Sequence, residues 1–597
     1  MCDSLRNLTK NNYQSCKVTG SLSIGGVPFP EPLTWTGCLP NECLDGKLAG
    51  SALPYLSAWL NKTTKGKVIA DPAKWMVACE EDLEFDAGAY AAITFLAVVG
   101  SLVVFGTLWH LLHSILLSVR EDTRIMDDDE DTDNLVQEQE PSEKEQSQIQ
   151  SESMISKAIK CFALQRTFKT LTAVETKPGQ VLCLNGIRVL SINWVILGHT
   201  FAFLSGMLGD PGDLAKLLQS RGFTLIANAF SSVDSFFTLS GFLVSFLLLK
   251  QLTKKGLLSI PQWTAFYVHR YIRLTTPYLV MILFEGFLYR HLVSGPFSVD
   301  IDVGTNHATC KQYWWTNLLY INNLVPWNPT GQNCLGQSWY LANDMQFFII
   351  APVFIVLLFA YPLIGNLVTT VTISCSAIAA AVITAHYNLA PSMSLGNPLN
   401  YTKVYRVPWT RISPYLVGIL GGWFYWCWGE QVQEKVKTLP VWKKVVIATP
   451  LWIATAAVEY EVVFGLYHDI QDHFIHGKAT SKTDSISYQM LARIGWSLAL
   501  ITQVLLCQFG LGGFINSLLS WKGWLVLSRL TYSVYLIHFG LIVILVDQTR
   551  HTFFVKPDFE FAVIYLGIVV MSYLAAVVLY VCVEQPVALL EGITYRK

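Results

Sequence analysis

The sequence predicts an all-α polytopic membrane protein with about eleven transmembrane helices. One anchor helix precedes a ten-helix body, and a small disulfide-rich extracellular domain lies at the N-terminus. Of the 597 residues, 52% are hydrophobic and only 14% are charged, which is not typical of a soluble protein. Apolar stretches of about 20 residues, each long enough to cross a hydrocarbon core, recur along the chain. The net charge of −1 gives no sign of binding to nucleic acid.

Residues 1–86 are predicted to form the extracellular or lumenal domain, because they combine cysteines with glycosylation sequons. The sequons begin at Asn7 and Asn61. Residues 1–86 contain five cysteines, an odd number, so one of them is free or bonds outside this domain. The candidates for disulfides here are Cys16, Cys38, Cys43 and Cys79. The sequence opens without the apolar core of a signal peptide, so we expect this domain to be truncated upstream.

Residues 87–119 are predicted to be the first transmembrane helix, and residues 120–180 a cytoplasmic linker. The linker carries an acidic run at 127–131 and a glutamine- and glutamate-rich stretch after it. Such segments are too polar to bury a core, so we expect the linker to be disordered. A calcium or partner site on the acidic run is the less favoured alternative.

Residues 181–590 are predicted to form the ten-helix body. Its spans are expected near 182–205, 223–249, 274–294, 338–361, 363–386, 411–428, 443–467, 486–511, 527–547 and 561–583. If the N-terminus is outside, eleven crossings leave the C-terminus in the cytoplasm, and lysine and arginine are then more frequent in the inner loops. A third sequon at Asn400 falls in an outer loop, as do Cys310 and Cys334, which are candidates for another disulfide.

Arg188 and His199 are the most informative residues of the body. They lie eleven positions apart in one apolar stretch, so on a helix both side chains share a face, about 16 Å apart along the axis. An ionisable residue at membrane depth is costly and by default marks a functional site. The alternative is a snorkelling arginine beside a histidine satisfied within the core.

Further ionisable residues are expected inside the body, His538 among them, and they predict a polar cavity. Asp234 or Asp344 could orient His199 through one ring nitrogen and leave the other nitrogen free as a base. Arg270 and Arg273, at i and i+3, lie at the expected cytoplasmic mouth and are suited to an anionic, phosphate-bearing cosubstrate. The alternative is that these two arginines only set the topology. We expect no metal ion and no prosthetic group.

Four segments together resemble the acyltransferase-3 family of membrane O-acyltransferases. These are the Arg188–His199 pair, the Asp234-Ser-Phe-Phe-Thr-Leu-Ser-Gly run, the Arg270/Arg273/Pro277 segment, and the Trp339…Asp344…Gln346-Phe-Phe segment. The resemblance covers about residues 180–590. The segment Gly37-Cys-Leu-Pro-Asn-Glu-Cys43 is similar to the cysteine-rich domain of the nose-resistant-to-fluoxetine branch. Bacterial members carry glutamate at the position of Asp344, and the aspartate side chain here is one methylene shorter than that glutamate.

This resemblance implies a membrane-bound enzyme that moves an acyl group from cytosolic acyl-CoA, its cosubstrate, to a hydroxyl-bearing acceptor such as a lipid, a sugar or a small molecule. It implies His199 as base or acyl carrier and Arg188 as its motif partner. We also expect Asp234 and Asp344 to take part in catalysis, and Arg270, Arg273 and Trp339 to bind substrate. The alternatives are a protein that transports or handles lipids or drugs, and a receptor-like protein. The expected location is the plasma membrane or the endoplasmic reticulum.

Overall fold

The computed structural model describes residues 84–128, 153–176, 179–205, 216–293, 307–327, 333–392, 398–476, 480–549 and 559–594, together with six short strands between residues 13 and 79. Within these ranges ten helices are long and apolar enough to cross a membrane. The chain is therefore an integral membrane protein with a helical body, as the sequence predicts. The predicted sites at Asn7, Cys43 and Asn61 lie outside the described residues.

The N-terminal strands form two small antiparallel sheets. The first sheet has the order β4-β1-β6, built from Leu33–Pro40, Tyr13–Gly20 and Met76–Cys79. The second has the order β3-β2-β5, built from Val27–Pro28, Leu22–Ile24 and Val68–Ala70. The register of β1 with β6 sets the backbone of Cys16 directly opposite that of Cys79. On the other side of β1, Cys38 of β4 lies opposite Ser15.

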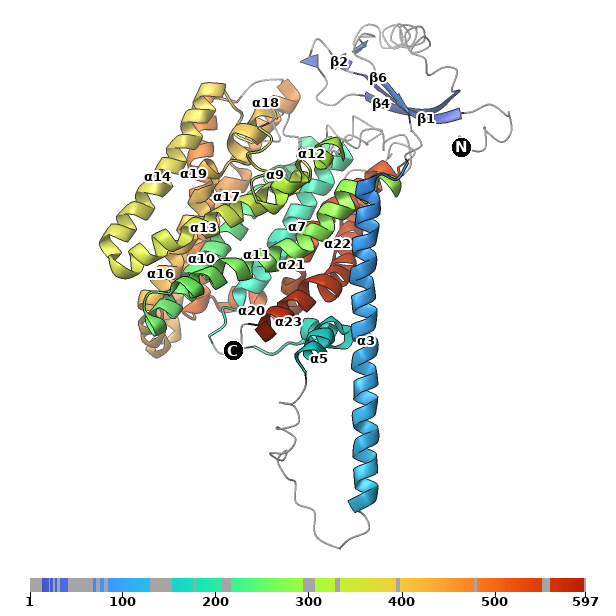
Figure 1. Cartoon of the computed structure of the whole chain (residues 1–597). Coiled ribbons are helices and arrows are strands. Elements are labelled where there is room, and N and C mark those ends of the chain that lie inside the picture. Colours follow the sequence, from blue (N-terminus) through green and yellow to red (C-terminus); the bar gives the residue numbers. More distant parts are fainter. Residues whose placement is uncertain are drawn as a thin grey trace.

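The first transmembrane helix, α3, runs from Ala87 to Asp128 and stands at the side of the bundle (Figure 1). Asp86 caps it, since the Ala89 amide donates to the Asp86 carboxylate at 2.9 Å. The same carboxylate lies 3.3 Å from both His307 and Lys311. Burial opposes ionisation of Asp86, yet these donors outweigh it and lower the pKa of the carboxyl group. This cluster fixes the start of α3 to α12.

The linker is more ordered than the sequence predicts. The α3 helix continues to Asp128, and residues 154–172 form α5 (Met154–Ile159), the 3₁₀ turn η3 (Lys160–Phe162) and α6 (Leu164–Thr172). These elements contact α3 and bury Cys161, Ala163 and Leu171. The expectation of disorder is therefore wrong for residues 154–172, because these three apolar side chains pack, although other apolar side chains of the segment stay exposed. The most polar part, 129–152, lies outside the described residues.

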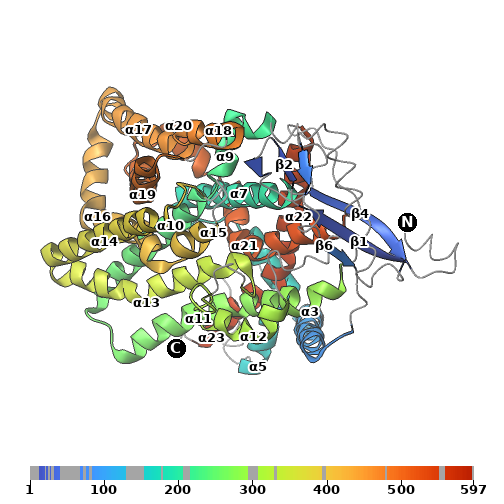
Figure 2. The same cartoon turned by 90° about the horizontal axis from the view of Figure 1, so that it is seen from above.

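The body consists of long helices joined by short ones: α7 (Cys183–Leu204), α9 (Arg221–Ala227), α10 (Ser231–Lys255), α11 (Ile260–Leu283), α12 (His307–Leu318), α13 (Trp339–Ala360), α14 (Pro362–Tyr387), α15 (Pro398–Asn400), α16 (Pro408–Thr438), α17 (Val441–Phe464), α18 (Tyr467–His476), α19 (Lys482–Gln508), α20 (Gly513–Leu519), α21 (Gly523–Asp547), α22 (Phe559–Leu579) and α23 (Gln585–Thr594). Seen from above, α7 lies in the middle of the bundle (Figure 2). It contacts α10, α21 and α22.

Two predicted spans differ from the helices observed. The span expected at 223–249 is divided into α9 and α10, because Asn228 ends α9 and its amide donates to the Val463 carbonyl at 2.7 Å. The span expected at 274–294 begins earlier, at Ile260, where Ser259 and Gln262 form a capping box. Arg270 and Arg273 consequently lie on α11 itself rather than ahead of its first turn.

Within the described ranges, three π-helical turns follow directly on helices of the body. They are η5 (Phe284–Leu288), which continues α11, η10 (Tyr401–Tyr405), and η11 (Tyr580–Glu584), which continues α22. Turns of this kind occur often at functional sites. Two of them carry a buried glutamate, Glu285 and Glu584.

Helices α10 and α16 cross at very short range through glycine. A Cβ atom on Gly241 would overlap the Tyr415 carbonyl oxygen, and one on Gly418 would overlap the Thr238 carbonyl oxygen. Small residues that let two backbones approach closely are typical of helix contacts in membranes. A core of buried side chains from α10, α13, α16 and α19 surrounds this contact.

We expect Gly418→Ala to lower the free energy of unfolding by about 1–3 kcal/mol, since the added methyl group must push two helices apart. The measurement is thermal unfolding of the purified protein in lipid nanodiscs. Gly567→Ala is the matched control, because a Cβ atom at Gly567 meets nothing within 4 Å. Equal melting temperatures for the two variants would contradict the close crossing of α10 and α16.

Candidate functional site

Arg188 and His199 lie on the same central helix, as the sequence predicts. Both belong to α7, an uninterrupted helix of 22 residues. Each of the two residues lies near a contact between α7 and another segment. Near Arg188, the position of Gly186 packs against the backbone of Leu519 in α20. His199 is near the other end of α7, where Gly198 packs against Ala229.

His199 pairs with a second histidine, His538 of α21. Their Nδ1 and Nε2 atoms lie 2.9 Å apart, and the rings stack at 5.2 Å between centroids. His538 is fully buried, and its Nδ1 lies 3.1 Å from the Val534 carbonyl oxygen. Sequence reasoning noted His538 as a buried polar residue without giving it a role.

The carbonyl of Val534 sets the protonation pattern of both rings. A carbonyl only accepts, so the proton of neutral His538 is on Nδ1 and its Nε2 is an acceptor. His199 must then donate from Nδ1, which leaves the lone pair of its Nε2 free. This tautomer assignment follows from the hydrogen-bond network. A half-buried imidazole with one nitrogen oriented and the other open has the arrangement of a general base.

A buried polar network surrounds His538. The Tyr535 ring lies 6.1 Å from the His538 ring, and the Tyr535 hydroxyl donates to the Gln337 carbonyl. The Gln337 amide donates to Glu285 at 3.1 Å. Glu285 also lies against Gly540, two residues beyond His538. The histidine pair is therefore braced by η5, by η8 (Gly336–Ser338) and by α21.

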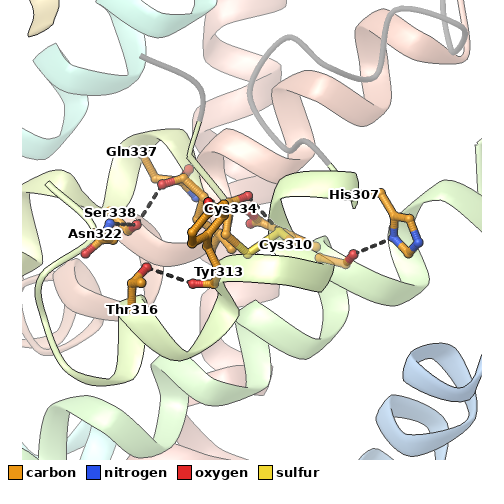
Figure 3. Close-up of a disulfide and its surroundings, with 11 residues drawn as sticks. His307, Cys310, Tyr313, Thr316, Asn322, Cys334, Gln337 and Ser338 are labelled. Atoms are coloured by element: carbon orange, nitrogen blue, oxygen red, sulfur yellow. Dashed lines mark hydrogen bonds between the residues drawn. A yellow bond between two sulfur atoms is a disulfide. The ribbon is translucent and has the colours of Figure 1, made fainter. Parts of the chain in front are cut away.

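Cys310 and Cys334 hold one side of this network (Figure 3). Their sulfur atoms lie 2.13 Å apart, the separation of a disulfide. The two sulfurs pack against Gly286, where a Cβ atom would lie 3.1 Å from the Cys310 sulfur. Gln337 and Ser338, three and four residues after Cys334, belong to η8 (Gly336–Ser338). The cross-link thus fixes the segment that brings Gln337 to Glu285.

Replacing both Cys310 and Cys334 by serine is expected to lower the free energy of unfolding by about 3 kcal/mol. The cross-link joins residues 24 positions apart, and closing a loop of this length restricts the unfolded chain. Thermal unfolding in nanodiscs checks the effect, with Cys375→Ser, an exposed free cysteine of α14, as control. Alkylation of Cys310 and Cys334 in the denatured, unreduced protein would contradict the cross-link.

Arg188 is a cation without a described counter-charge. Among the described residues, no hydrogen bond or ion pair involves its guanidinium group. The groups that act on it electrostatically are Tyr340 and Arg273, and Arg273 repels it. Arg273 itself is exposed and also acts on Glu584 and Glu591. The positive charge of Arg188 is therefore available to an anion.

Tyr340 connects Arg188 to the histidine pair. Its ring lies 5.5 Å from that of Tyr535, which in turn adjoins His538. A row of side chains from Arg188 through Tyr340 and Tyr535 to His538 thus crosses the middle of the bundle. The row begins at Arg188 and ends at His538, whose partner His199 lies on the same helix as Arg188.

Asp344 and Arg270 form an ion pair, and neither reaches His199. The Arg270 side chain is 22% exposed and the Asp344 side chain 8%. The Ser240 hydroxyl donates to Asp344 at 2.8 Å, and the Arg270 guanidinium lies 4.3 Å from the Phe348 ring centre. Asp344 therefore does not orient His199, since Arg270 occupies it. The same pair leaves Arg270 less free than Arg273 to bind a cosubstrate.

Asp234 is in a second buried ion pair, with Arg411 of α16. The Arg411 Nη1 atom lies 2.7 Å from the Asp234 carboxylate, and its Nε donates to the Tyr405 carbonyl. Trp339 lies here too, with the Arg411 guanidinium 5.4 Å from its ring centre. Asp234 and Trp339 are thus grouped away from the histidine pair. The expectation that Asp234 orients His199 is wrong, because Arg411 holds the carboxylate.

The side chain of Asn400 is buried, with 1% of its surface exposed. Its amide nitrogen, the atom to which a glycan is attached, donates to the Ala390 carbonyl at 2.8 Å. A glycan would have no room on this nitrogen in the folded protein. Burial thus argues against the sequon at Asn400.

A multi-pass helical membrane body with a histidine and an arginine on one central helix is the arrangement that the resemblance to membrane acyltransferases implies. Residues 181–581 match the model of the acyltransferase domain called acyltransferase 3. The chain belongs to the acyltransferase-3 family. The resemblance stated from the sequence is confirmed.

Two relatives from Caenorhabditis elegans are similar to this chain. Nose resistant to fluoxetine protein 6 is 30% identical over 403 residues, which are 64% of this chain and 47% of that protein. The chain therefore spans about half the length of that relative. Regulator of hypoxia-inducible factor 1 is 22% identical over 463 residues, which are 72% of this chain and 83% of that protein. No solved structure matches the chain significantly.

Proposed function

We propose that this protein transfers an acyl group from acyl-CoA to the hydroxyl group of an acceptor, with His199 as the base. The observation that carries the proposal is the hydrogen-bonded series Val534, His538 and His199, which leaves Nε2 of His199 free to accept a proton. Membership of the acyltransferase-3 family supports the same reaction class.

In the proposed reaction, His199 Nε2 takes the proton of the acceptor hydroxyl as its oxygen attacks the thioester carbonyl. The carbon–sulfur bond then breaks, and the CoA sulfur receives the proton from His199. The products are an ester and free CoA. In a covalent version, His199 Nε2 carries the acyl group before the acceptor arrives. His538 stabilises the imidazolium that forms, because it accepts the hydrogen bond from His199 Nδ1.

Arg188 and Arg273 are the proposed contacts for the anionic part of acyl-CoA. Arg188 has no described counter-charge, and the two arginines repel each other. A phosphate between them would relieve this repulsion. Arg188 is about 16 Å from His199 along α7, so it serves the arm of CoA rather than the reacting carbonyl.

We place the N-terminal domain outside the cytoplasm and the C-terminus inside it. Helices α5, α20 and α23 gather at one end of the bundle, opposite α9, α12 and α18 (Figure 1). Lys254 and Lys255 end α10 at the proposed inner side, and Lys435 and Lys437 end α16 there. This excess of lysine follows the positive-inside rule. Together with the ten apolar helices, the 31-residue α16 then brings the number of crossings to eleven. The membrane is that of the cell surface or the endoplasmic reticulum.

The decisive experiment supplies radiolabelled acyl-CoAs of different chain lengths to the purified full chain in lipid nanodiscs. Release of CoA is followed for the wild type, His199→Ala and Arg188→Gln. His386→Ala is the matched control, because His386 is exposed at the end of α14. We expect turnover in the wild type and in the control, loss in His199→Ala, and a raised KM for acyl-CoA in Arg188→Gln.

Absence of turnover with every donor, in protein that unfolds cooperatively, would contradict the proposed reaction. It would favour the alternative, in which the protein transports or handles lipids or drugs. Turnover that His199→Ala retains would leave the enzyme but remove His199 as its base.

A further inference from the structure

A second polar site lies apart from the histidine pair, where α9, α10, α16 and α19 meet at the end of the bundle that holds α18. A cavity of about 50 Å³ is found there. Cavities of this size admit a few water molecules or one small polar group. We call it the Arg493 cavity, and the residues that line it include Ser231, Asp234, Tyr405, Arg411, Gln489 and Arg493.

The Arg493 cavity has an excess of positive charge. Arg411 is 1% exposed and is neutralised by Asp234 at 2.7 Å. Arg493 is half-buried, and its described partners are neutral oxygens: the Gln489 side chain at 2.8 Å, and the carbonyls of Gln489 and Thr410 at 3.4 and 3.5 Å. Two guanidinium groups thus share one carboxylate.

The electrostatic surroundings of Arg493 reinforce this imbalance. The charged group that acts most strongly on it is Arg411, which repels it, and the attraction of Asp234 is weaker. A buried or half-buried charge without a counter-charge is unfavourable, and an anion would relieve it. Neutral acceptors hold the guanidinium group in place, but they leave its charge uncompensated.

The cavity also offers donors other than arginine. Ser231 belongs to its lining, and among the described residues no hydrogen bond of the Ser231 hydroxyl is found. Tyr405 belongs to the same lining, and its hydroxyl has none either within the described part of the chain. A guanidinium fork with hydroxyl donors beside it suits a carboxylate or a phosphate oxygen.

We infer that the Arg493 cavity binds the anionic head of a ligand, a carboxylate or phosphate group, through Arg493 and Ser231. The volume admits the charged head and leaves the rest of the ligand outside. The site is separate from Arg188, which lies near the opposite end of α7, beside α20. The inference therefore does not rest on the proposed acyl transfer.

The test is thermal unfolding of the full chain in nanodiscs of phosphatidylcholine alone. Sodium phosphate and sodium succinate are titrated against sodium chloride at equal ionic strength. We expect either or both anions to give a saturable rise of about 2–4 °C in Tm, since a ligand that binds only the folded state stabilises it. Arg493→Gln should lose this rise. Ser231→Ala should raise the half-saturating concentration about fivefold, as the loss of one hydrogen bond implies.

Arg166→Gln is the matched control, because Arg166 is an exposed arginine of α6 outside the lining of the cavity, and the variant should retain the full rise. Should Arg493→Gln fail to fold, Arg493→Lys and Ser231→Ala provide the comparison, and both should weaken the response. A second arm uses nanodiscs that contain phosphatidic acid, in chloride only. A rise that appears there and depends on Arg493 identifies a lipid headgroup as the source of the anion.

Two results would overturn the inference. One is the absence of stabilisation by phosphate, by succinate and by the anionic lipid. The other is an equal rise in the wild type and in Arg493→Gln, which would assign the effect to anions elsewhere on the protein. Neither result bears on acyl transfer, because no step of this assay uses acyl-CoA.

Discussion

Replacing His538 by alanine is expected to lower the kcat of acyl transfer by a factor of roughly 10²–10³, with little change in the KM for acyl-CoA. His538 does not reach the reacting atoms, so it acts as a positioning residue. It accepts the hydrogen bond from His199 Nδ1 and thereby keeps the lone pair of His199 on Nε2. Without it, His199 can rotate and can carry its proton on the wrong nitrogen. The measurement is steady-state CoA release by the purified variant in nanodiscs.

The conservative variant His538→Gln separates positioning from simple packing. A glutamine oxygen can accept from His199 Nδ1, so part of the activity should return, whereas alanine restores none. The pH dependence of kcat should also move in His538→Ala, because His199 then titrates without its neighbour. An unchanged kcat in a folded His538→Ala protein would show that the histidine pair is only structural.

Breaking the ion pair of Asp234 and Arg411 is expected to give the largest loss of stability. Asp234→Asn should lower the free energy of unfolding by about 3–5 kcal/mol, because it leaves a buried arginine without its counter-charge. The loss is aggravated by Arg493, which then faces Arg411 with no carboxylate between them. Thermal or chemical unfolding in nanodiscs gives the measurement.

Two companion variants make this prediction sharper. The double variant Asp234→Leu with Arg411→Met removes both charges and should recover most of the loss, since a buried pair is often replaced by apolar residues at little cost. Lys437→Ala breaks an exposed ion pair, in which the side chains of Lys437 and Glu434 are 71% and 75% exposed. This variant should change the free energy of unfolding by less than about 1 kcal/mol. A double variant no more stable than Asp234→Asn would refute the charge argument.

The local pattern of the sequence was sufficient for the helices and for the face shared by Arg188 and His199. Both follow from the periodicity of one segment. The partners of these residues could not be predicted in the same way. His538 is 339 positions from His199, and no local rule relates two residues so far apart. Spacing identified a candidate base, but the group that orients it depends on how α7 packs against α21.

The carboxylates illustrate the same limit. Asp234 and Asp344 were recognised as buried, and a buried carboxylate needs a partner. The sequence offered several cations and no means of choosing among them. Packing assigns Arg411 to Asp234 and Arg270 to Asp344, so that neither carboxylate remains for His199. The start of α11 was missed for a different reason: its first turns are polar, and the capping box at Ser259 outweighs their low hydropathy.

The π-helical turns have a consequence for how the bundle meets its surroundings. An α-helix that runs through a membrane presents one continuous stripe to its neighbours. A π turn holds one residue more than an α turn needs, so the stripe that follows it is rotated about the axis. The helix that carries Glu584 is in this sense two shorter helices, α22 and α23, joined end to end, each with its own inward face. At Glu285 the π turn lies at the end of α11 and is followed only by a short 3₁₀ turn. A carboxylate can then point into the protein at the joint while the segments on both sides keep their apolar faces toward the lipid.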